Sequence, residues 1–416
     1  MSFLGAADAA RADQAGLRRM NRRIKMNAVL AAVVITVVAG LITSCGNGSA
    51  NSAPDHQAYV TLTGQGSVLL MGINGATGVI TAGGKTPPVQ NASFNGLALT
   101  PSRQFLYAVN SRENTISIFT IAEGGSLILT GAPVPAGNGA DEAVVDPTGE
   151  YLLVTNSIGS GPSGGDISVY SIAAGTGVLT EVTGSPFDAN EGPTQILFTH
   201  SGEFVYAVNP SIGMVSGFVF CPPQRASQPQ CSGATAVLTP APGSPAISGA
   251  GAAALALDGS DQFLYVVNPS AINPPPFEST VGNVSAFSID PNTGALSPIL
   301  GSPFTSTAGT GPAAIAVDPS SRFVYAVNPG SSDSIWCFAI TPTNGVLQEV
   351  ANSPFSLASG GQFALFDSTG NFLYIGSESG AGIEGYTYDP STGKPTAITG
   401  SPFSTGTAPG EIVISD

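Results

Sequence analysis

The sequence predicts an all-β fold, a β-propeller of seven blades with four antiparallel strands in each. A unit made of a small apolar strand, a turn and an aromatic-rich strand recurs six times, with successive spacings of 46, 53, 59, 60 and 48 residues. Four-stranded propeller blades repeat at such a period. The 416 residues include 53 glycines and 33 prolines, and 42% of them are hydrophobic. So many helix breakers disfavour long helices, and so much apolar content disfavours disorder.

The first 44 residues form a predicted export signal. Basic residues cluster in 18–25, and an apolar run follows over 27–45. A positively charged segment before a short apolar stretch is typical of secretory signals. The run ends in the tetrapeptide ITSC, residues 42–45. This tetrapeptide resembles the lipobox of bacterial lipoproteins, in which the cysteine is lipidated and becomes the first residue.

The signal leads to an expected division of the chain. We expect a lipid anchor at Cys45, a flexible tether over 45–56 and the propeller over 57–416. The alternative is a single N-terminal transmembrane anchor with an incidental cysteine. Both interpretations make the protein membrane-anchored and place the propeller outside the cytoplasm, on the periplasmic or cell-surface side.

The other cysteines fit such a compartment. Cys221 and Cys231 lie ten residues apart in the proline-rich segment FCPPQRASQPQC. A disulfide is the expected use of two such cysteines in an oxidising environment. A metal site is the less favoured alternative, because no His or third Cys is near in sequence. Cys337 alternates with apolar residues and is expected to be a small buried side chain.

The repeated unit carries two further markers in the same register. Glycines at hairpin positions that require a left-handed backbone would join the third and fourth strands of each blade. Blade 4 lacks this hairpin, and the segment between Cys221 and Cys231 takes its place. A Ser-Pro-Phe sequence closes several units. The hairpin glycines are Gly78, Gly125, Gly177, Gly294, Gly345 and Gly393, and the Ser-Pro-Phe units start at Ser185, Ser302, Ser353 and Ser401.

The two ends of the repeat region supply the seventh blade. The segments AYVTLT, SVLLMGI and VITAG near the start resemble second, third and fourth strands with no first strand before them. The final segment, 410–416, resembles a first strand with nothing after it. Pairing the two closes the ring and removes the exposed sheet edges that an open array would have.

The repeats LYVVN and YAVNP, with DPSG-like turns and DPxTGxL hairpins, resemble the YVTN and lactonase-type seven-bladed propellers. This family includes 6-phosphogluconolactonase-like and carboxymuconate-cyclising proteins. The resemblance covers about 57–416 and implies the fold more strongly than an activity, because the motif is mostly core and turn. The tyrosine of each repeat is expected to pack within the blades, and each repeat asparagine to bond turn backbone. The tyrosines are Tyr107, Tyr206, Tyr265, Tyr325 and Tyr374.

Aligned repeats place a candidate site at the mouth of the central channel, where the first strands begin. Ligands favour such a concave place, because loops of all blades converge there. Two blades offer only alanine, at Ala253-Ala254 and Ala313-Ala314. The polar candidates are Asn95, Asp141, Glu142, Thr194, Gln195, Gln362 beside Phe363, and Glu411 beside Gly410, with Arg112, Glu113 and Glu378 in loops on the same face.

The mouth departs from the lactonase pattern that the resemblance implies. Members of that branch carry an Arg-His pair in a segment like Gly-Pro-Arg-His, and the matching segment here is Gly-Pro-Thr-Gln, residues 192–195. The two histidines, His56 in the tether and His200 in a turn, are expected to be solvated. A phosphorylated substrate would need clustered cations, and Arg112 alone does not provide them. Activity on 6-phosphogluconolactone is therefore not expected.

Two functions remain open. One is a binding or scaffold module that holds a protein, peptide or glycan at the mouth. The other is a hydrolase or isomerase of a neutral lactone, with Ca²⁺ held by Asp141, Glu142 and Glu411, because carboxylates suit hard cations; otherwise these carboxylates are simply solvated. From Cys45 onward six basic residues face 25 acidic ones, a net charge of 6 − 25 = −19. Such a surface excludes nucleic acid as a partner.

Overall fold

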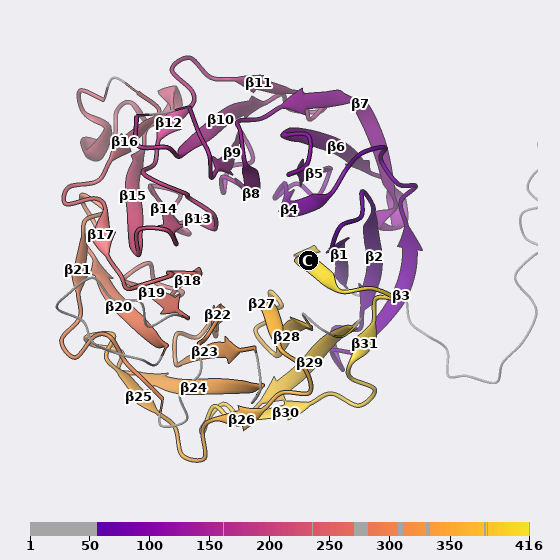
Figure 1. The fold of residues 1–416 in the computed structure, drawn as a ribbon, viewed down its shortest axis with the longest axis vertical. Helices are drawn as coiled ribbons and strands as arrows, with labels where there is room; N and C mark the ends of the chain where they lie inside the picture. Colours follow the sequence, from indigo (N-terminus) through magenta and orange to yellow (C-terminus); the bar gives the residue numbers. More distant parts are fainter. Residues whose placement is uncertain are drawn as a thin grey trace, which may run out of the picture. The chain divides into compact units, whose positions relative to one another are not determined.

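The predicted ring of seven blades is confirmed. The computed structural model describes residues 56–415 except 161, 235, 270–281, 307–310, 330–332, 378–379 and 381. Seven antiparallel sheets surround a central channel (Figure 1). They belong to one compact unit, Ser52–Asp416. No helix among the described residues is long and apolar enough to cross a membrane.

Each blade runs outward from the channel. The inner strands of blades 1 to 7 are β32 (Pro409–Ser415), β4 (Phe94–Leu99), β8 (Ala140–Val145), β13 (Ile196–Phe198), β18 (Ala254–Leu257), β22 (Ala314–Val317) and β27 (Gly361–Phe366). The second strands are β1 (His56–Leu62), β5 (Phe105–Asn110), β9 (Tyr151–Asn156), β14 (Phe204–Asn209), β19 (Phe263–Asn268), β23 (Phe323–Asn328) and β28 (Phe372–Ser377).

The outer half of each blade follows the same order. The third strands are β2 (Val68–Ile73), β6 (Thr115–Ile121), β10 (Asp166–Ile172), β15 (Met214–Phe220), β20 (Asn283–Ile289), β24 (Ser334–Ile340) and β29 (Gly382–Tyr388). The fourth strands are β3 (Ile80–Lys85), β7 (Leu127–Pro135), β11 (Leu179–Glu181), β16 (Leu238–Pro240), β21 (Leu296–Pro298), β25 (Leu347–Glu349) and β30 (Pro395–Ala397). Short strands β12 (Phe187–Asp188), β17 (Ala246–Ile247), β26 (Phe355–Ser356) and β31 (Phe403–Ser404) pair with the third strands.

The termini of the propeller close the ring as predicted. Strand β32 pairs antiparallel with β1, with Tyr59 opposite Val413. Strand β1 begins at His56, so the ring includes a histidine that the sequence analysis placed in the tether. Its ring Nδ1 is buried and has no hydrogen-bond partner. The residue as a whole is partly exposed, and the strand reaches one residue further toward the N-terminus than the repeat alignment suggests.

The predicted hairpin glycines have the expected backbone conformation. All six have positive φ angles between 67° and 81°. They also serve as acceptors between blades, because a buried tyrosine on six of the seven second strands donates its hydroxyl to the hairpin glycine carbonyl of the next blade. The pairs are Tyr59–Gly125 (3.0 Å), Tyr107–Gly177 (3.0 Å), Tyr206–Gly294 (2.8 Å), Tyr265–Gly345 (3.1 Å), Tyr325–Gly393 (2.8 Å) and Tyr374–Gly78 (2.9 Å).

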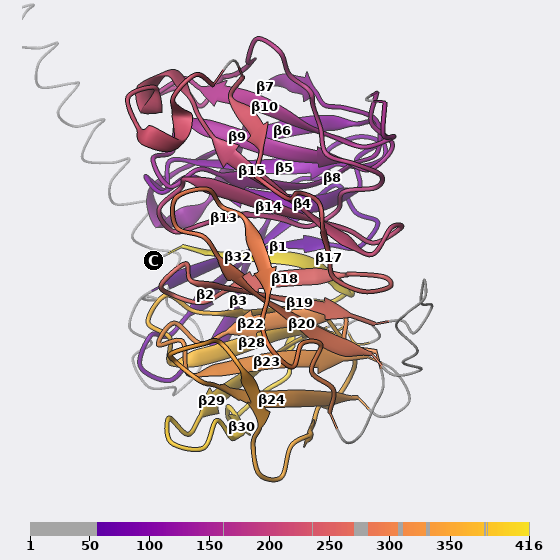
Figure 2. The same ribbon diagram turned by 90° about the vertical axis from the view of Figure 1, so that its left-hand side faces the viewer.

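The junction between blades 3 and 4 is the exception. Blade 4 has no hairpin glycine, and the matching tyrosine position in blade 3 is Leu153, which is fully buried. The insert between β15 and β16 contains η2 (Pro223–Arg225) and η3 (Pro229–Cys231), and the predicted disulfide between Cys221 and Cys231 closes it. From this insert Gln224 accepts a hydrogen bond from the Tyr151 hydroxyl at 2.9 Å. The insert thus supplies the contact that the lost hairpin cannot make, and its coil projects from the ring in Figure 2.

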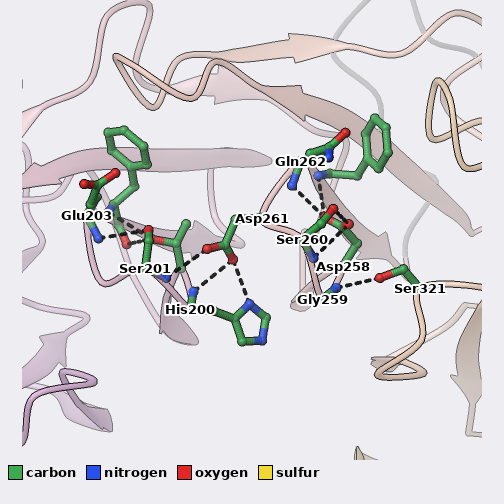
Figure 3. Close-up of polar contacts among 12 residues, drawn as sticks. His200, Ser201, Glu203, Asp258, Gly259, Ser260, Asp261, Gln262 and Ser321 are labelled. Carbon is green, nitrogen blue, oxygen red and sulfur yellow. Dashed lines mark hydrogen bonds and ion pairs between the residues drawn. The ribbon is translucent and has the colours of Figure 1, made fainter.

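A second set of contacts joins the turns between first and second strands. The amides of His200 and Ser201 donate to the Asp261 carboxylate (2.9 Å each), and the amide of Gly259 donates to the Ser321 hydroxyl (2.8 Å; Figure 3). In three other blades the turn position that matches His200 and Gly259 is a proline, which has no amide hydrogen to donate. The facing residue of the next blade is then glycine. These pairs are Pro101–Gly149, Pro147–Gly202 and Pro319–Gly370. A Cβ atom on these glycines would lie 3.0–3.3 Å from the proline ring.

Candidate functional site

Bulges in the inner strands place the polar side chains at the channel mouth. In β8, Asp141 and Glu142 together lie opposite the single residue Thr155 of β9. Such a bulge bends the strand and redirects its side chains. Three other inner strands are irregular at the corresponding place. The bulged residues are Asn95 and Gly96 in β4, Asp141 and Glu142 in β8, Gln362 in β27, and Gly410 and Glu411 in β32.

Two threonines support the bulges that carry glutamates. The Thr155 hydroxyl accepts a hydrogen bond from the Glu142 amide at 3.1 Å, and the Thr61 hydroxyl accepts one from the Glu411 amide at 2.8 Å. Most other repeats have valine at this position. The threonines therefore satisfy amides that the bulge removes from the regular strand pairing.

The bulged residues line one pocket of about 490 Å³. It lies at the end of the channel where the inner strands begin, and blades 1, 2, 3, 4 and 7 contribute to it. Blades 5 and 6, with alanines at the corresponding positions, do not. The lining residues are Thr63, Phe94, Asn95, Asp141, Glu142, Gln195, Gln362, Phe363, Ala364, Leu365, Gly410, Glu411 and Ile412. No basic side chain is among them.

Some lining side chains reach forward to the next blade. Glu411 Oε2 accepts a hydrogen bond from the Leu97 amide of blade 2 at 2.5 Å, and Gln195 Oε1 accepts one from the Leu255 amide of blade 5 at 2.6 Å. Asn95 Nδ2 donates to Asp141 Oδ1 at 3.1 Å. Among the described residues the carboxyl group of Glu142 has no hydrogen-bond partner, so it remains available to a ligand.

Two carboxyl groups of the pocket favour the protonated form. Burial, followed by the charges of Glu411 and Asp141, raises the pKa of Glu142 well above its usual value. Burial also raises the pKa of Glu411, with a further rise from Asp141 and a partial offset from the Leu97 amide. Because these glutamates influence each other, they titrate as a pair. When one of these carboxyl groups is protonated, the pocket can both donate and accept hydrogen bonds.

Other predicted candidates lie elsewhere. Arg112 is exposed in the turn after β5, and the pocket lining does not include it. His200 lies on the opposite face, where its ring Nδ1 is 2.7 Å from Asp261 Oδ1 and its side chain is 63% exposed. The hydrogen bond with Asp261 raises the pKa of His200. Cys45 and Glu378 fall outside the described residues.

The calcium site expected at the mouth stays a prediction. Asp141, Glu142 and Glu411 line the same pocket, as expected, but among the described residues no group of three or more His, Cys, Asp or Glu is arranged to hold a metal ion. One oxygen of Asp141 and one of Glu411 already accept protein hydrogen bonds.

Sequence reasoning missed five residues of the pocket lining: Thr63, Phe94, Ala364, Leu365 and Ile412. Phe94 precedes the bulge of β4 and is 1% exposed. Thr63 follows β1, whose place in the ring depends on the closing strand. In the repeats of blades 1 and 3 a threonine replaces valine. This substitution was the sequence signal that could have indicated the bulges carrying Glu411 and Glu142.

Seven four-stranded blades, closed by the terminal strands and holding a polar pocket at one end of the channel, define a seven-bladed β-propeller with a candidate ligand site. The family model described as "Lactonase, 7-bladed beta-propeller" matches residues 143–304 and 277–408, which together are more than half of the chain. The chain belongs to this family. The comparison with curated proteins found no match.

Solved structures share the fold at low sequence identity. A proposed 6-phosphogluconolactonase from Bacteroides uniformis is 21% identical with a TM-score of 0.67, over 86% of this chain and 99% of that one. One from Bacteroides fragilis is 20% identical with a TM-score of 0.67, over 89% and 100%. The periplasmic gluconolactonase of Pseudomonas aeruginosa is 17% identical with a TM-score of 0.66, over 87% and 99%.

Proposed function

We propose that this protein is an exported propeller that binds a neutral, hydroxyl-rich small molecule, such as a glycan unit or sugar lactone, in the pocket at the channel mouth. The observation that carries the proposal is the carboxyl pair of Glu142 and Glu411 in a pocket that has amide groups and no basic side chain. Carboxyl and amide groups suit hydroxyl partners, and the phenyl ring of Phe363 suits the apolar face of a sugar ring.

A phosphorylated ligand fits this pocket poorly. Phosphate sites use Arg, Lys or clustered backbone amides, because the phosphate carries negative charge. When ionised, Asp141 and the glutamate pair carry negative charge, as phosphate does, so the pocket would repel a phosphate group. The proposal therefore differs from the phosphogluconolactonase description of two of the structural neighbours.

Calorimetric titration of the purified protein tests the proposal. The ligands are a panel of neutral sugars, gluconolactone and 6-phosphogluconate, each with and without Ca²⁺. We expect one neutral ligand to bind and Glu142→Gln to weaken it at least about tenfold, as the loss of a hydrogen bond to a charged or strongly polar group implies. Thr305→Val is the control, because Thr305 is exposed in the segment between β21 and β22 and does not line the pocket, and it should leave affinity unchanged. Preferential binding of 6-phosphogluconate would refute the proposal.

Hydrolysis of a neutral lactone is the second candidate. It is favoured by the raised pKa of Glu142, because acids with shifted pKa values gather at catalytic sites. In this scheme one carboxylate removes a proton from water, the hydroxide oxygen bonds to the lactone carbonyl carbon, and the ring C–O bond breaks. The protonated partner then donates its proton to the leaving oxygen. Release of acid from a lactone, abolished by Glu142→Gln and by Glu411→Gln, would identify turnover instead of binding.

We also propose that the chain is held at a membrane by lipid on Cys45. The proposal rests on the lipobox-like ITSC tetrapeptide after the apolar run, and the disulfide in the ring agrees with an oxidising compartment. Labelling of cells with an alkyne fatty acid should mark the protein, and Cys45→Ser should remove the label and release the protein from membranes. Labelling that persists in the variant would contradict the lipid anchor.

A further inference from the structure

A second cavity of about 500 Å³ lies at the opposite end of the channel from the polar pocket. Its walls come from the far ends of the inner strands of blades 1, 2, 3 and 7. Most of its side chains are apolar, among them Leu99, Val145 and Ile414. Arg103, in the turn after β4, lies at its rim.

The two cavities share part of their walls. Leu365 of β27 and Ile412 of β32 line both of them. Ile412 directly follows Glu411 of the carboxyl pair, so the walls change from polar to apolar within a single residue of the closing strand. Channel-lining apolar side chains that are partly exposed, such as Leu99 and Val145, are not fully covered by the protein itself.

We propose that the ligand is an amphiphile, with a neutral hydroxyl-bearing head in the polar pocket and a hydrocarbon chain in the apolar cavity. This inference rests on the proposed function, because it takes the head group from that proposal and adds the chain. A ligand that ended at the polar pocket would leave the apolar walls of the channel in contact with water. A chain that fills them removes that contact, and each buried methylene adds to affinity.

Titration with matched glucosides tests the inference. Methyl β-D-glucoside offers the head alone, hexyl β-D-glucoside adds a chain, and 1-hexanol offers the chain without the sugar. With the full-length protein, we expect hexyl glucoside to bind at least about tenfold more tightly than methyl glucoside, with one molecule per chain. Glu142→Gln should weaken both glucosides by the same factor.

Variants at one position of the repeat test where the hydrocarbon chain of the ligand binds. Val145→Asn and Ile414→Asn each make the apolar cavity polar and should remove the gain of hexyl glucoside over methyl glucoside. Val317→Asn is the matched control, because Val317 holds the same position of the repeat in blade 6 but does not line the cavity. It should keep the gain. Thermal melting of each variant shows whether it is folded, and two cavity variants keep the test valid if one fails.

Each outcome decides between the proposals. If methyl glucoside binds and hexyl glucoside binds no better, the amphiphile inference fails and the proposed function stands. If the gain survives both cavity variants, or several molecules bind per chain, the chain adsorbs to the surface and the inference also fails. If only 1-hexanol and hexyl glucoside bind, with a loss in Val145→Asn, the apolar cavity is a site but the sugar head is wrong.

Discussion

Loss of the tyrosine hydroxyls that join successive blades should weaken the ring by a measurable amount. In Tyr265→Phe the carbonyl of Gly345 loses a donor 3.1 Å away in the fully buried interface between blades 5 and 6. An unsatisfied buried acceptor costs about 1–2 kcal/mol. With about 2.1 cal/mol/K of unfolding entropy per residue, a ring of this length should melt about 1–3 °C lower. Because the junctions are separate, the losses in a variant that also carries Tyr206→Phe and Tyr374→Phe should nearly add.

The assay is thermal melting followed by circular dichroism. Tyr388→Phe is the control, because its hydroxyl is only partly buried and lies 3.5 Å from Asp318. A complementary variant, Leu153→Tyr, should destabilise the protein although it restores the repeat consensus, because blade 4 has no hairpin glycine to accept the hydroxyl. A melting temperature of the triple variant within 1 °C of the wild type corresponds to a total loss of stability below about 1 kcal/mol. In that case the hydroxyls do not hold the blades together.

Three further predictions concern ionisation and packing. The raised pKa of Glu142 means that wild-type stability should fall as pH rises above about 4.5 toward that raised value. Glu142→Gln should reduce this slope, leaving the part due to Glu411, and melt higher at pH 8. His200 has a raised pKa, and Asp261 a lowered one, because hydrogen bonds from His200 and Ser201 outweigh its burial. Their pairing should stabilise most between pH 3.8 and 6.5, so His200→Ala should lower the melting temperature in that window and little at pH 9. Gly96→Ala should destabilise by about 1–3 kcal/mol in denaturant titrations, because its Cβ would lie 2.7 Å from a backbone oxygen of the next blade.

Much of the fold could be predicted because the repeats share local rules. A hairpin that demands positive φ selects glycine, so the positions Gly78 to Gly393 could be assigned from sequence alone. The alignment of the repeats also placed Glu142 and Glu411 at one end of the channel, although they are far apart in sequence. In both cases the repeat pattern predicts where a residue lies within its own blade.

Contacts between blades were much harder to predict. The charge of Glu411 raises the pKa of Glu142 because bulges turn both side chains into one pocket, and a bulge depends on pairing with a neighbouring strand. The apolar cavity beneath them has no motif at all, since its walls are ordinary strand residues such as Val145. Arg112 lies in a loop on the face of the pocket but is not among its lining residues, and the loop position alone could not show this.

The hydrogen bonds between blades run one way around the circle, from each second-strand tyrosine to the blade that follows it. The ring therefore has a direction. Each blade depends on the neighbouring blade for a hydrogen-bond partner, as well as on its own sequence for its fold. A duplicated blade 4 inserted elsewhere would leave the preceding tyrosine without an acceptor, whereas a duplicated blade 5 would offer one. Whole blades can therefore be added or removed less freely at blade 4, where the disulfide-closed insert, Cys221 to Cys231, has replaced the hairpin. New chain termini introduced within that insert would leave all six tyrosine contacts in place.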